Sequence, residues 1–333
     1  MMRLPWFDHR MPRSVAEASK ILAGEGPQAM LIAGGTDLLP NMKRRHQTPK
    51  VLVSLKGIDS LRKANGSLGS GLTLSDVLRI ENIPTALRQA AAQVATVHLR
   101  NAGTLGGNLC LDTRCNYYNQ NYEWRKAIDF CLKKDGDICW VATASKRCVA
   151  VSSTDTAPAL IALNAKVVLE GAHGEREIPV EALYQNDGID YLSRKPDEIL
   201  TKVSVPAGWK STYWKLRRRG AFDFPILGVA VALKFSGGDV IESARVALGA
   251  AASRPFLVEK AGEFLAGKKL TEEVIAEASL LIANRAKPMD NTDMDLYWRK
   301  EVADDFAGYA LRELRGDDMR DTRLKTARQA VAA

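Results

Sequence analysis

The chain has 333 residues, of which 46% are hydrophobic and 26% are charged. This length is about twice that of a typical domain, so we expect two or three folding units, and the composition excludes a disordered or fibrous protein. The apolar run at residues 224–233 is too short to span a bilayer, so no membrane segment is expected. The net charge of +8 comes from basic residues scattered among acidic ones, which favours a solvated surface over a nucleic-acid-binding face.

The first residues, MMRLPWFDHRMPRS, lack the apolar stretch of a secretory signal, so we expect a cytoplasmic protein. Thiols are normally kept reduced in the cytoplasm. A local group of cysteines then indicates a metal site or catalysis rather than disulfides.

The first third of the chain alternates helical and strand patterns. Ser14 and Glu17 form a capping-box pattern at the start of a helix over residues 14–23. Residues 30–40 predict a short strand that leads into a glycine-containing loop. Further predicted elements are strands at 51–55 and 72–74 and a helical segment at 77–95 that breaks at Pro84.

The remainder predicts more strands and two long helices. Residues 155–171 predict a helical turn followed by a strand, and residues 198–206 predict an exposed edge strand that ends at a proline. A strand-rich unit begins near residue 212, and two helical patterns follow at 271–286 and 294–315. The C-terminal tail carries mixed charges without a period, so we expect it to fray.

Two glycine-containing segments, residues 33–38 and 104–108, suggest a phosphate-binding site. Consecutive glycines let the backbone approach a ligand and turn several N–H groups toward phosphate oxygens, so the two segments suit a pyrophosphate held from both sides. Neither segment matches the dinucleotide fingerprint GxGxxG or the P-loop, so these two sites are not supported. For each segment a plain turn is the alternative.

All five cysteines lie between residues 110 and 148. Cys115, Cys131, Cys139 and Cys148 supply the four thiolates that a cubane iron–sulfur cluster requires. Zinc also accepts four thiolates, although structural zinc sites usually take cysteines as close pairs, which are missing here. Four unrelated buried thiols are the third alternative.

The order of LIAGGTDLLP, RNAGTLGGNL, DTAPALIAL, EILTKVSVP and YWKLRRRGAFDFP resembles the FAD-binding medium subunits of the xanthine oxidase and carbon monoxide dehydrogenase family of molybdenum hydroxylases. The likeness runs from about residue 4 to about residue 315. It implies an α+β fold, with a two-subdomain FAD-binding domain of the vanillyl-alcohol-oxidase type at 1–208. A smaller α+β C-terminal domain of the CO dehydrogenase flavoprotein type would follow at 209–318, with a tail at 319–333.

The same resemblance implies how FAD is bound. The first glycine segment would wrap the pyrophosphate and the second would close over it from the other side. Asp155 would bond the ribityl chain, and Lys215 would lie near the pyrimidine edge of the flavin, where a cation stabilises the anionic reduced ring. The implied FAD-binding residues are Ile32, Ala33, Gly34, Gly35, Thr36, Asp37, Leu38, Thr104, Gly106, Gly107, Asn108, Asp155, Ile199, Leu200 and Lys215.

Plain alternatives exist for the isolated members of this set. Asp155 fits a helix cap, and Lys215 fits a surface lysine. The predicted apolar contacts of the isoalloxazine, Ile199 and Leu200, equally fit a hydrophobic core.

An insertion over about residues 112–152 separates the second glycine segment from the helix near Asp155, whereas most members of the family join the two directly. Its sequence resembles the cluster-binding insertion of the 4-hydroxybenzoyl-CoA reductase subgroup. The resemblance implies a 4Fe-4S cluster on Cys115, Cys131, Cys139 and Cys148. Cys110 would remain a thiol beside FAD.

No catalytic residue is assigned, because the four histidines are dispersed and neither an HExxH nor a Ser-His-Asp pattern occurs. The resemblance implies an oxidoreductase subunit that relays electrons between its cluster, its FAD and the centres of two partners. These would be a large molybdopterin subunit and a small 2Fe-2S subunit, in a dimer of heterotrimers with a ferredoxin-like donor.

The implied reaction is the reductive dehydroxylation of 4-hydroxybenzoyl-CoA to benzoyl-CoA in anaerobic aromatic degradation. One alternative is the same subunit in an enzyme for another aromatic, heterocyclic or CoA-linked substrate. A second alternative is a flavoprotein whose four cysteines hold structural zinc.

Overall fold

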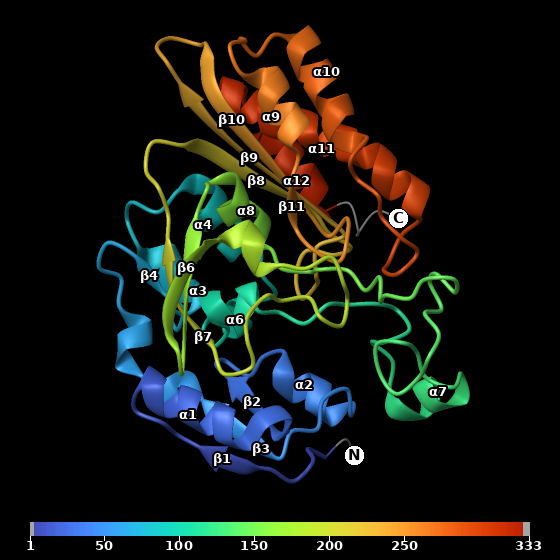
Figure 1. Ribbon diagram of the computed structural model, residues 1–333. Helices are drawn as coiled ribbons and strands as arrows, with labels where there is room; N and C mark the ends of the chain where they lie inside the picture. The colour runs from blue at the N-terminus through green and yellow to red at the C-terminus, as the bar shows by residue number, and fades with distance from the viewer. Residues whose placement is uncertain (1–2, 329–333) are drawn as a thin grey trace.

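A parallel three-stranded sheet forms the N-terminal part of the computed structural model, which describes residues 3–328 (Figure 1). Helix α1 packs on this sheet because Val15, Ala18 and Leu22 lie on one helical face and meet the buried side chains of the central strand. The strand order is β1-β3-β2, and the elements are β1 (Asp8–Arg10), α1 (Val15–Glu25), β2 (Ala29–Ile32), α2 (Leu38–Lys43) and β3 (Val51–Ser54).

A second, antiparallel sheet follows, with the order β4-β7-β5-β6. Its strands are β4 (Leu68–Gly69), β5 (Lys166–Gly171), β6 (Gly174–Pro179) and β7 (Ile199–Ser204). Helix α8 (Thr156–Ala162) is buried along its whole length in the core of this part. The other helices here are α3 (Leu74–Arg79), α4 (Thr85–Ala92), α5 (Val97–Arg100) and α6 (Leu105–Leu109).

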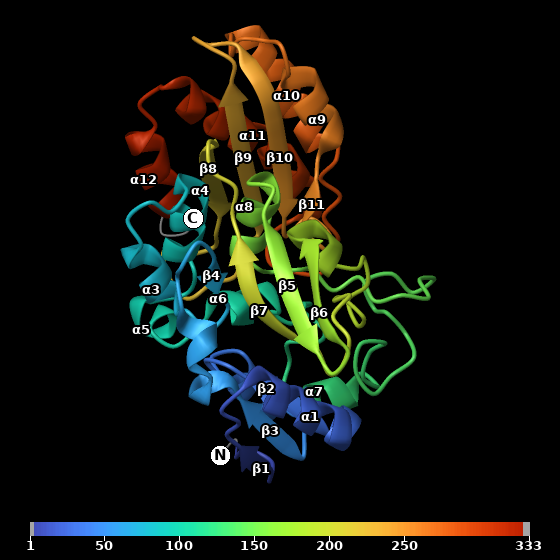
Figure 2. The same cartoon turned by 60° about the vertical axis from the view of Figure 1, so that its left-hand side comes forward.

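The third sheet is antiparallel, lies between two layers of helices and has the order β11-β10-β9-β8 (Figure 2). Alternate side chains of β8 enter different cores: Tyr213 packs toward α4 and α8, and Trp214 packs toward α11. The elements are β8 (Lys210–Leu216), β9 (Leu227–Phe235), β10 (Ile241–Gly249), β11 (Phe256–Leu257), α9 (Glu259–Leu265), α10 (Glu272–Ala283), α11 (Leu296–Arg315) and α12 (Arg320–Arg328).

The segment of residues 112–152 projects from the body of the molecule and contains the short helix α7 (Tyr122–Ala127) (Figure 1). Asn291, in the C-terminal part, contacts both ends of this segment. The Asn116 amide donates to the Asn291 carbonyl (2.8 Å), and the Asn291 side-chain amide donates to the Val149 carbonyl (2.6 Å). The two ends of the segment are therefore held side by side.

The predicted α+β class is confirmed, but two local predictions are wrong and a third is only half right. Residues 72–74 form no strand, because Thr73 caps α3 in a capping box with Asp76. The strand predicted as an exposed edge, β7, lies between β4 and β5. The predicted capping box is half formed: the Ser14 hydroxyl accepts from the Glu17 amide (3.1 Å), but the Glu17 side chain accepts from the Arg13 amide (2.8 Å) instead of the Ser14 amide.

The predicted fraying tail contains helix α12, and residues 329–333 lie outside the described residues. The predicted domain boundary at residue 208 falls between β7 and β8. Within residues 3–328, every helix is too short or too polar to cross a membrane.

Candidate functional site

A cavity of about 620 Å³ lies where the loop after β2, the start of α6, the residue before α8 and the start of β7 meet. Its volume is in the range of sites that bind cofactors. All but one of the predicted FAD-binding residues line it; Lys215 is the exception. The lining members are Ile32, Ala33, Gly34, Gly35, Thr36, Asp37, Leu38, Thr104, Gly106, Gly107, Asn108, Asp155, Ile199 and Leu200.

The first glycine segment touches the residues just before the second, in the wall of this cavity. A Cβ atom on Gly34 would lie 2.0 Å from the Ala102 carbonyl oxygen, so only glycine permits this approach of the two backbones. Gly35 has a φ of 70°, in the left-handed region that favours glycine. Segments about 70 residues apart in the sequence thus form one continuous wall. The first segment then enters the short helix α2, whereas residues 105–108 of the second are themselves part of α6.

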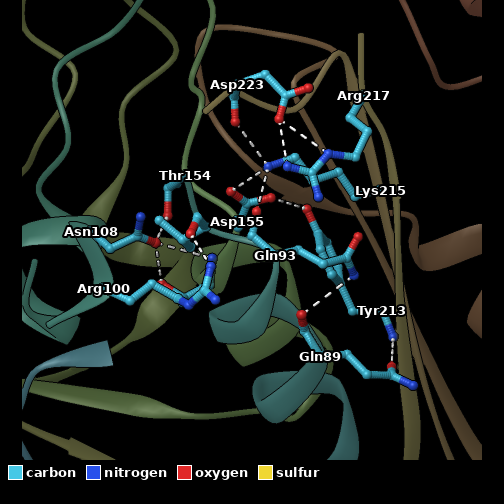
Figure 3. A network of polar contacts seen from close by, with 12 residues as sticks. Gln89, Gln93, Arg100, Asn108, Thr154, Asp155, Tyr213, Lys215, Arg217 and Asp223 are labelled. Carbon is cyan, nitrogen blue, oxygen red and sulfur yellow. Dashed lines mark hydrogen bonds and ion pairs between the residues drawn. The ribbon is translucent and has the colours of Figure 1, made fainter. Parts of the chain in front are cut away.

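Side chains at the second glycine segment are held in fixed orientations (Figure 3). The Thr104 hydroxyl accepts from the Gly107 amide (3.0 Å) and caps α6. The Asn108 Oδ1 atom accepts from the Thr154 hydroxyl (2.9 Å), and from the amide (3.1 Å) and hydroxyl (2.6 Å) of Thr156. These contacts occupy the oxygen, so the NH₂ group of Asn108 is left as a hydrogen-bond donor in the cavity wall.

Asp155 is a buried acceptor in the cavity wall (Figure 3). It accepts from the Tyr213 hydroxyl (2.8 Å) and from the Lys215 ammonium (3.1 Å). The ammonium also donates to the carbonyls of Gln93 (3.0 Å) and Asp223 (3.1 Å), which uses all three of its donors. Burial raises the pKa of Asp155 and lowers the pKa of Lys215, and each shift is opposed by the charge of the partner.

These contacts exclude the plain alternatives for the two residues, whereas their roles toward FAD stay predictions. Asp155 precedes α8 but makes no side-chain capping bond, so the cap interpretation is wrong. Lys215 has a fully buried side chain, so the surface-lysine interpretation is also wrong. Lys215 lies behind Asp155 instead of lining the cavity. Its approach to the flavin edge stays a prediction.

Two further charged pairs border the cavity, and the sequence patterns gave no sign of either. The Arg114 guanidinium pairs with Asp37 and donates to the Asn41 side-chain oxygen (2.9 Å). The Lys133 ammonium lies 2.8 Å from Asp112. Burial alone would raise the pKa of Asp112, but the charges of Lys133 and Arg114 outweigh it and hold this pKa below its usual value. Asp112 is therefore a carboxylate at neutral pH.

The four predicted metal ligands share a second, much smaller cavity. Cys115, Cys131, Cys139 and Cys148 are all buried, and all line it. Burial raises the pKa of Cys115 to about 12 and that of Cys148 to about 11, so both are protonated thiols at neutral pH. The other lining residues are Tyr117, Tyr118, Leu132, Lys133, Trp140, Val141 and Ala150.

This donor set fits the chemistry of soft metals, because buried thiols among aromatic side chains suit iron–sulfur clusters and zinc. The four thiols surround the cavity without converging on one point. Across residues 3–328, no set of three or more His, Cys, Asp or Glu side chains is placed so that it could hold a single metal ion. Cys110 lies apart from the four and lines the large cavity.

Comparisons with known proteins identify both halves of the chain. The model of the FAD binding domain in molybdopterin dehydrogenase matches residues 6–208, and that of the CO dehydrogenase flavoprotein C-terminal domain matches residues 211–314. The carbon monoxide dehydrogenase medium chain of Hydrogenophaga pseudoflava is 28% identical over 86% of this chain and 90% of its own. The aldehyde oxidoreductase FAD-binding subunit of Escherichia coli is 29% identical over 89% and 96%.

Solved structures share the fold. The carbon monoxide dehydrogenase of Hydrogenophaga pseudoflava that lacks the Mo-pyranopterin moiety matches with a TM-score of 0.74 and 24% identity, over 93% of this chain and 97% of that chain. Quinoline 2-oxidoreductase from Pseudomonas putida 86 matches with a TM-score of 0.70 and 23% identity, over 98% and 99%. Because the first family model alone covers more than half of its residues, this chain belongs to the FAD-binding medium subunits of the xanthine oxidase and carbon monoxide dehydrogenase family.

Proposed function

We propose that this chain is the electron-transfer subunit of a molybdenum enzyme, with FAD in the large cavity and a 4Fe-4S cluster on Cys115, Cys131, Cys139 and Cys148. The observation that carries the proposal is the pairing of two cavities: four buried thiols surround one, and the predicted FAD-binding residues line the other. When bound, FAD supplies one- or two-electron exchange and the cluster supplies one-electron exchange.

The residues of the large cavity are suited to hold each part of FAD. The first glycine segment, residues 33–38, offers backbone N–H groups to the pyrophosphate, and Asn108 of the second adds its NH₂ group. The amides of residues 105–108 already donate to other protein groups. Asp155, held by Tyr213 and Lys215, accepts from ribityl hydroxyls. Ile199 and Leu200 would give an apolar surface to the isoalloxazine. In the small cavity, the thiols release their protons when they ligate metal.

The proposal extends to partner chains, because relatives are named as parts of larger assemblies. One is the 6-hydroxypseudooxynicotine dehydrogenase complex subunit alpha of Paenarthrobacter nicotinovorans, 25% identical over 90% of this chain and 92% of its own. We infer that this chain joins a large molybdopterin subunit and a small 2Fe-2S subunit in a dimer of heterotrimers. The substrate site then lies on the large subunit.

The reaction that we propose is the reductive dehydroxylation of 4-hydroxybenzoyl-CoA with a ferredoxin-like donor. It rests on the cysteine-bearing insertion and its resemblance to that subgroup. The second candidate is oxidation of another aromatic, heterocyclic or CoA-linked substrate, which is favoured by the similarity to the nicotinate dehydrogenase FAD-subunit of Eubacterium barkeri, since nicotinate is heterocyclic. A structural zinc site on the four thiols is the weaker alternative.

Metal and flavin analysis of the anaerobically purified chain tests the cofactors. We expect one FAD and about four irons with four sulfides per chain. Cys131→Ser removes the iron and keeps FAD, whereas the matched variant Cys110→Ser, outside the thiol cavity, keeps the iron. Fewer than about three irons per chain after reconstitution contradicts the cluster, and one zinc in their place supports the alternative.

A substrate assay on the assembled complex tests the reaction. With a reduced ferredoxin or viologen as donor, 4-hydroxybenzoyl-CoA should yield benzoyl-CoA. Nicotinate, aldehydes and carbon monoxide, offered with an electron acceptor, serve as the comparison set. Turnover of one of these without any benzoyl-CoA formation favours the second candidate and leaves the cofactor assignment intact.

A further inference from the structure

The ion pair of Lys133 and Asp112 lies in the wall between the two cavities. Lys133 lines the thiol cavity, and Asp112 lines the large one. The Nζ–Oδ1 distance is 2.8 Å, and both side chains are more than nine-tenths buried, at 7% and 6% exposure. Removing two charges from water costs several kcal/mol per ion, so such a pair persists only where its geometry is good.

The position of the ammonium is fixed by further contacts. Lys133 Nζ also donates to the Thr113 hydroxyl (2.6 Å) and to the Gly188 carbonyl (2.5 Å). The Gly188 amide in turn donates to the Cys148 carbonyl (2.8 Å), which ties the lysine and one of the thiol-bearing residues to the same point of the backbone. The Lys133 charge is thus held at the border of the thiol cavity.

Two aromatic rings also lie next to the ammonium of this pair. The ammonium lies 4.8 Å from the ring centroid of Tyr118 and 5.5 Å from that of Tyr191. The Tyr118 hydroxyl donates to Asp112 (2.9 Å), so it satisfies a second site on the carboxylate. Since the surroundings are buried and largely aromatic, a charge here acts over a short distance with weak screening by solvent.

We propose that Lys133 raises the reduction potential of the redox centre held by the four thiols and that Asp112 opposes this effect. The inference rests on the proposed function. Four thiolates make the centre anionic, and reduction adds one more negative charge, so a nearby cation stabilises the reduced state more than the oxidised state. Net charge and local electrostatics are among the known determinants of cluster potentials. The negative charge of Asp112, which lines the large cavity, lowers the reduction potential instead.

Anaerobic redox titration of the purified complex, followed by the EPR signal of the reduced cluster, tests this inference. We expect Lys133→Met to shift the midpoint potential to a more negative value and Asp112→Asn to shift it to a more positive value. Lys133→Arg keeps the charge and should stay close to the wild type. Lys166→Met, which breaks an exposed pair with Glu177, is the matched control and should leave the potential unchanged.

The opposite signs separate a charge effect from general damage to the site. If both variants of the pair bind iron and shift the potential in the same direction, or neither shifts it, the inference is overturned. If Lys133→Met loses the cluster, Asp112→Asn tests the inference alone. A shift of its midpoint potential to a more positive value supports the inference, and no shift or a shift to a more negative value overturns it. A wild-type chain without iron overturns the proposed cluster itself, whereas a loaded wild type with unshifted variants overturns only the role of Lys133.

Discussion

Two buried lysine–aspartate pairs border the large cavity, and they differ in what lies behind the lysine. In each, the aspartate lines the cavity and accepts from a lysine ammonium and from a tyrosine hydroxyl: Asp155 with Lys215, and Asp112 with Lys133. Lys215 also donates to the backbone carbonyls of Gln93 and Asp223, whereas Lys133 faces the thiol cavity. The same combination of aspartate, lysine and tyrosine therefore orients one carboxylate in the first pair and lies between two cavities in the second.

Cys115, which lines the thiol cavity with Lys133, stays protonated in spite of that nearby cation. Burial raises the pKa of Cys115 from its ordinary value of 9.0 to about 12, so its thiolate fraction at neutral pH falls by about a thousandfold. We expect metal-free protein to react with iodoacetamide correspondingly slowly at Cys115, with a rate that rises about tenfold per pH unit below pH 12. Peptide mass spectrometry measures the rate.

The same chain in urea is the control for that experiment, since there the thiol regains its ordinary pKa. Equal rates of modification at Cys115 in the folded and the unfolded chain would contradict the buried, protonated state.

Lys215→Met should break the first pair and leave Asp155 as a buried carboxylate without a counter-charge. Removing one partner of a buried pair typically costs about 3–5 kcal/mol, so we expect a loss of this size in the free energy of unfolding, measured with urea, together with weaker FAD retention. Lys166→Met is the matched control, because its pair with Glu177 is about half exposed and should contribute less than about 1 kcal/mol. Equal losses in the two variants would argue against a structural role for the buried pair.

Gly34→Ala tests whether the two cavities are independent. The added Cβ would strike the Ala102 carbonyl and push the glycine segments apart, at a cost of about 1–3 kcal/mol. We expect loss of FAD with the iron content preserved, measured by absorbance and metal analysis. Gly24→Ala is the control, since a Cβ there meets nothing within 4 Å. Parallel loss of iron and flavin would show that the cavities do not form separately.

The smallest expected effect separates the two tyrosines. Tyr213→Phe and Tyr118→Phe each delete one hydrogen bond to an aspartate, of 2.8 Å and 2.9 Å. Each should lower the free energy of unfolding by about 1–2 kcal/mol. Only Tyr118→Phe should alter the EPR signal of the cluster, because Tyr118 lines the thiol cavity and Tyr213 does not. A spectral change in both variants would remove the distinction between the pairs.

The features that the sequence predicted well are those that depend on local chemistry. Gly34 marks a close backbone approach because a Cβ there would strike the Ala102 carbonyl, Gly35 adopts a left-handed φ, and the four cysteines already lie close together along the chain. The strand predicted at residues 72–74 followed the apolar residues beside Thr73, whereas the spacing of Thr73 and Asp76 is that of the capping box found in the structure.

The features that the sequence did not predict depend on long-range contacts. Arg114 and Asp37 pair across 77 positions, and Lys133 and Asp112 pair across 21. Charged residues have no periodicity that identifies a partner at such separations, since the pairing follows from the packing of whole elements. The place of Lys215 behind Asp155 was hidden for the same reason.

The contacts of Asn291 carry a consequence for dissecting the protein. This residue belongs to the C-terminal part, yet it forms hydrogen bonds with both ends of the cysteine-bearing segment, at Asn116 and Val149. A truncated chain that stops before β8 would retain every thiol but lose these two hydrogen bonds. The placement of the four thiols therefore depends on both halves of the polypeptide, although the four cysteines all come from one half.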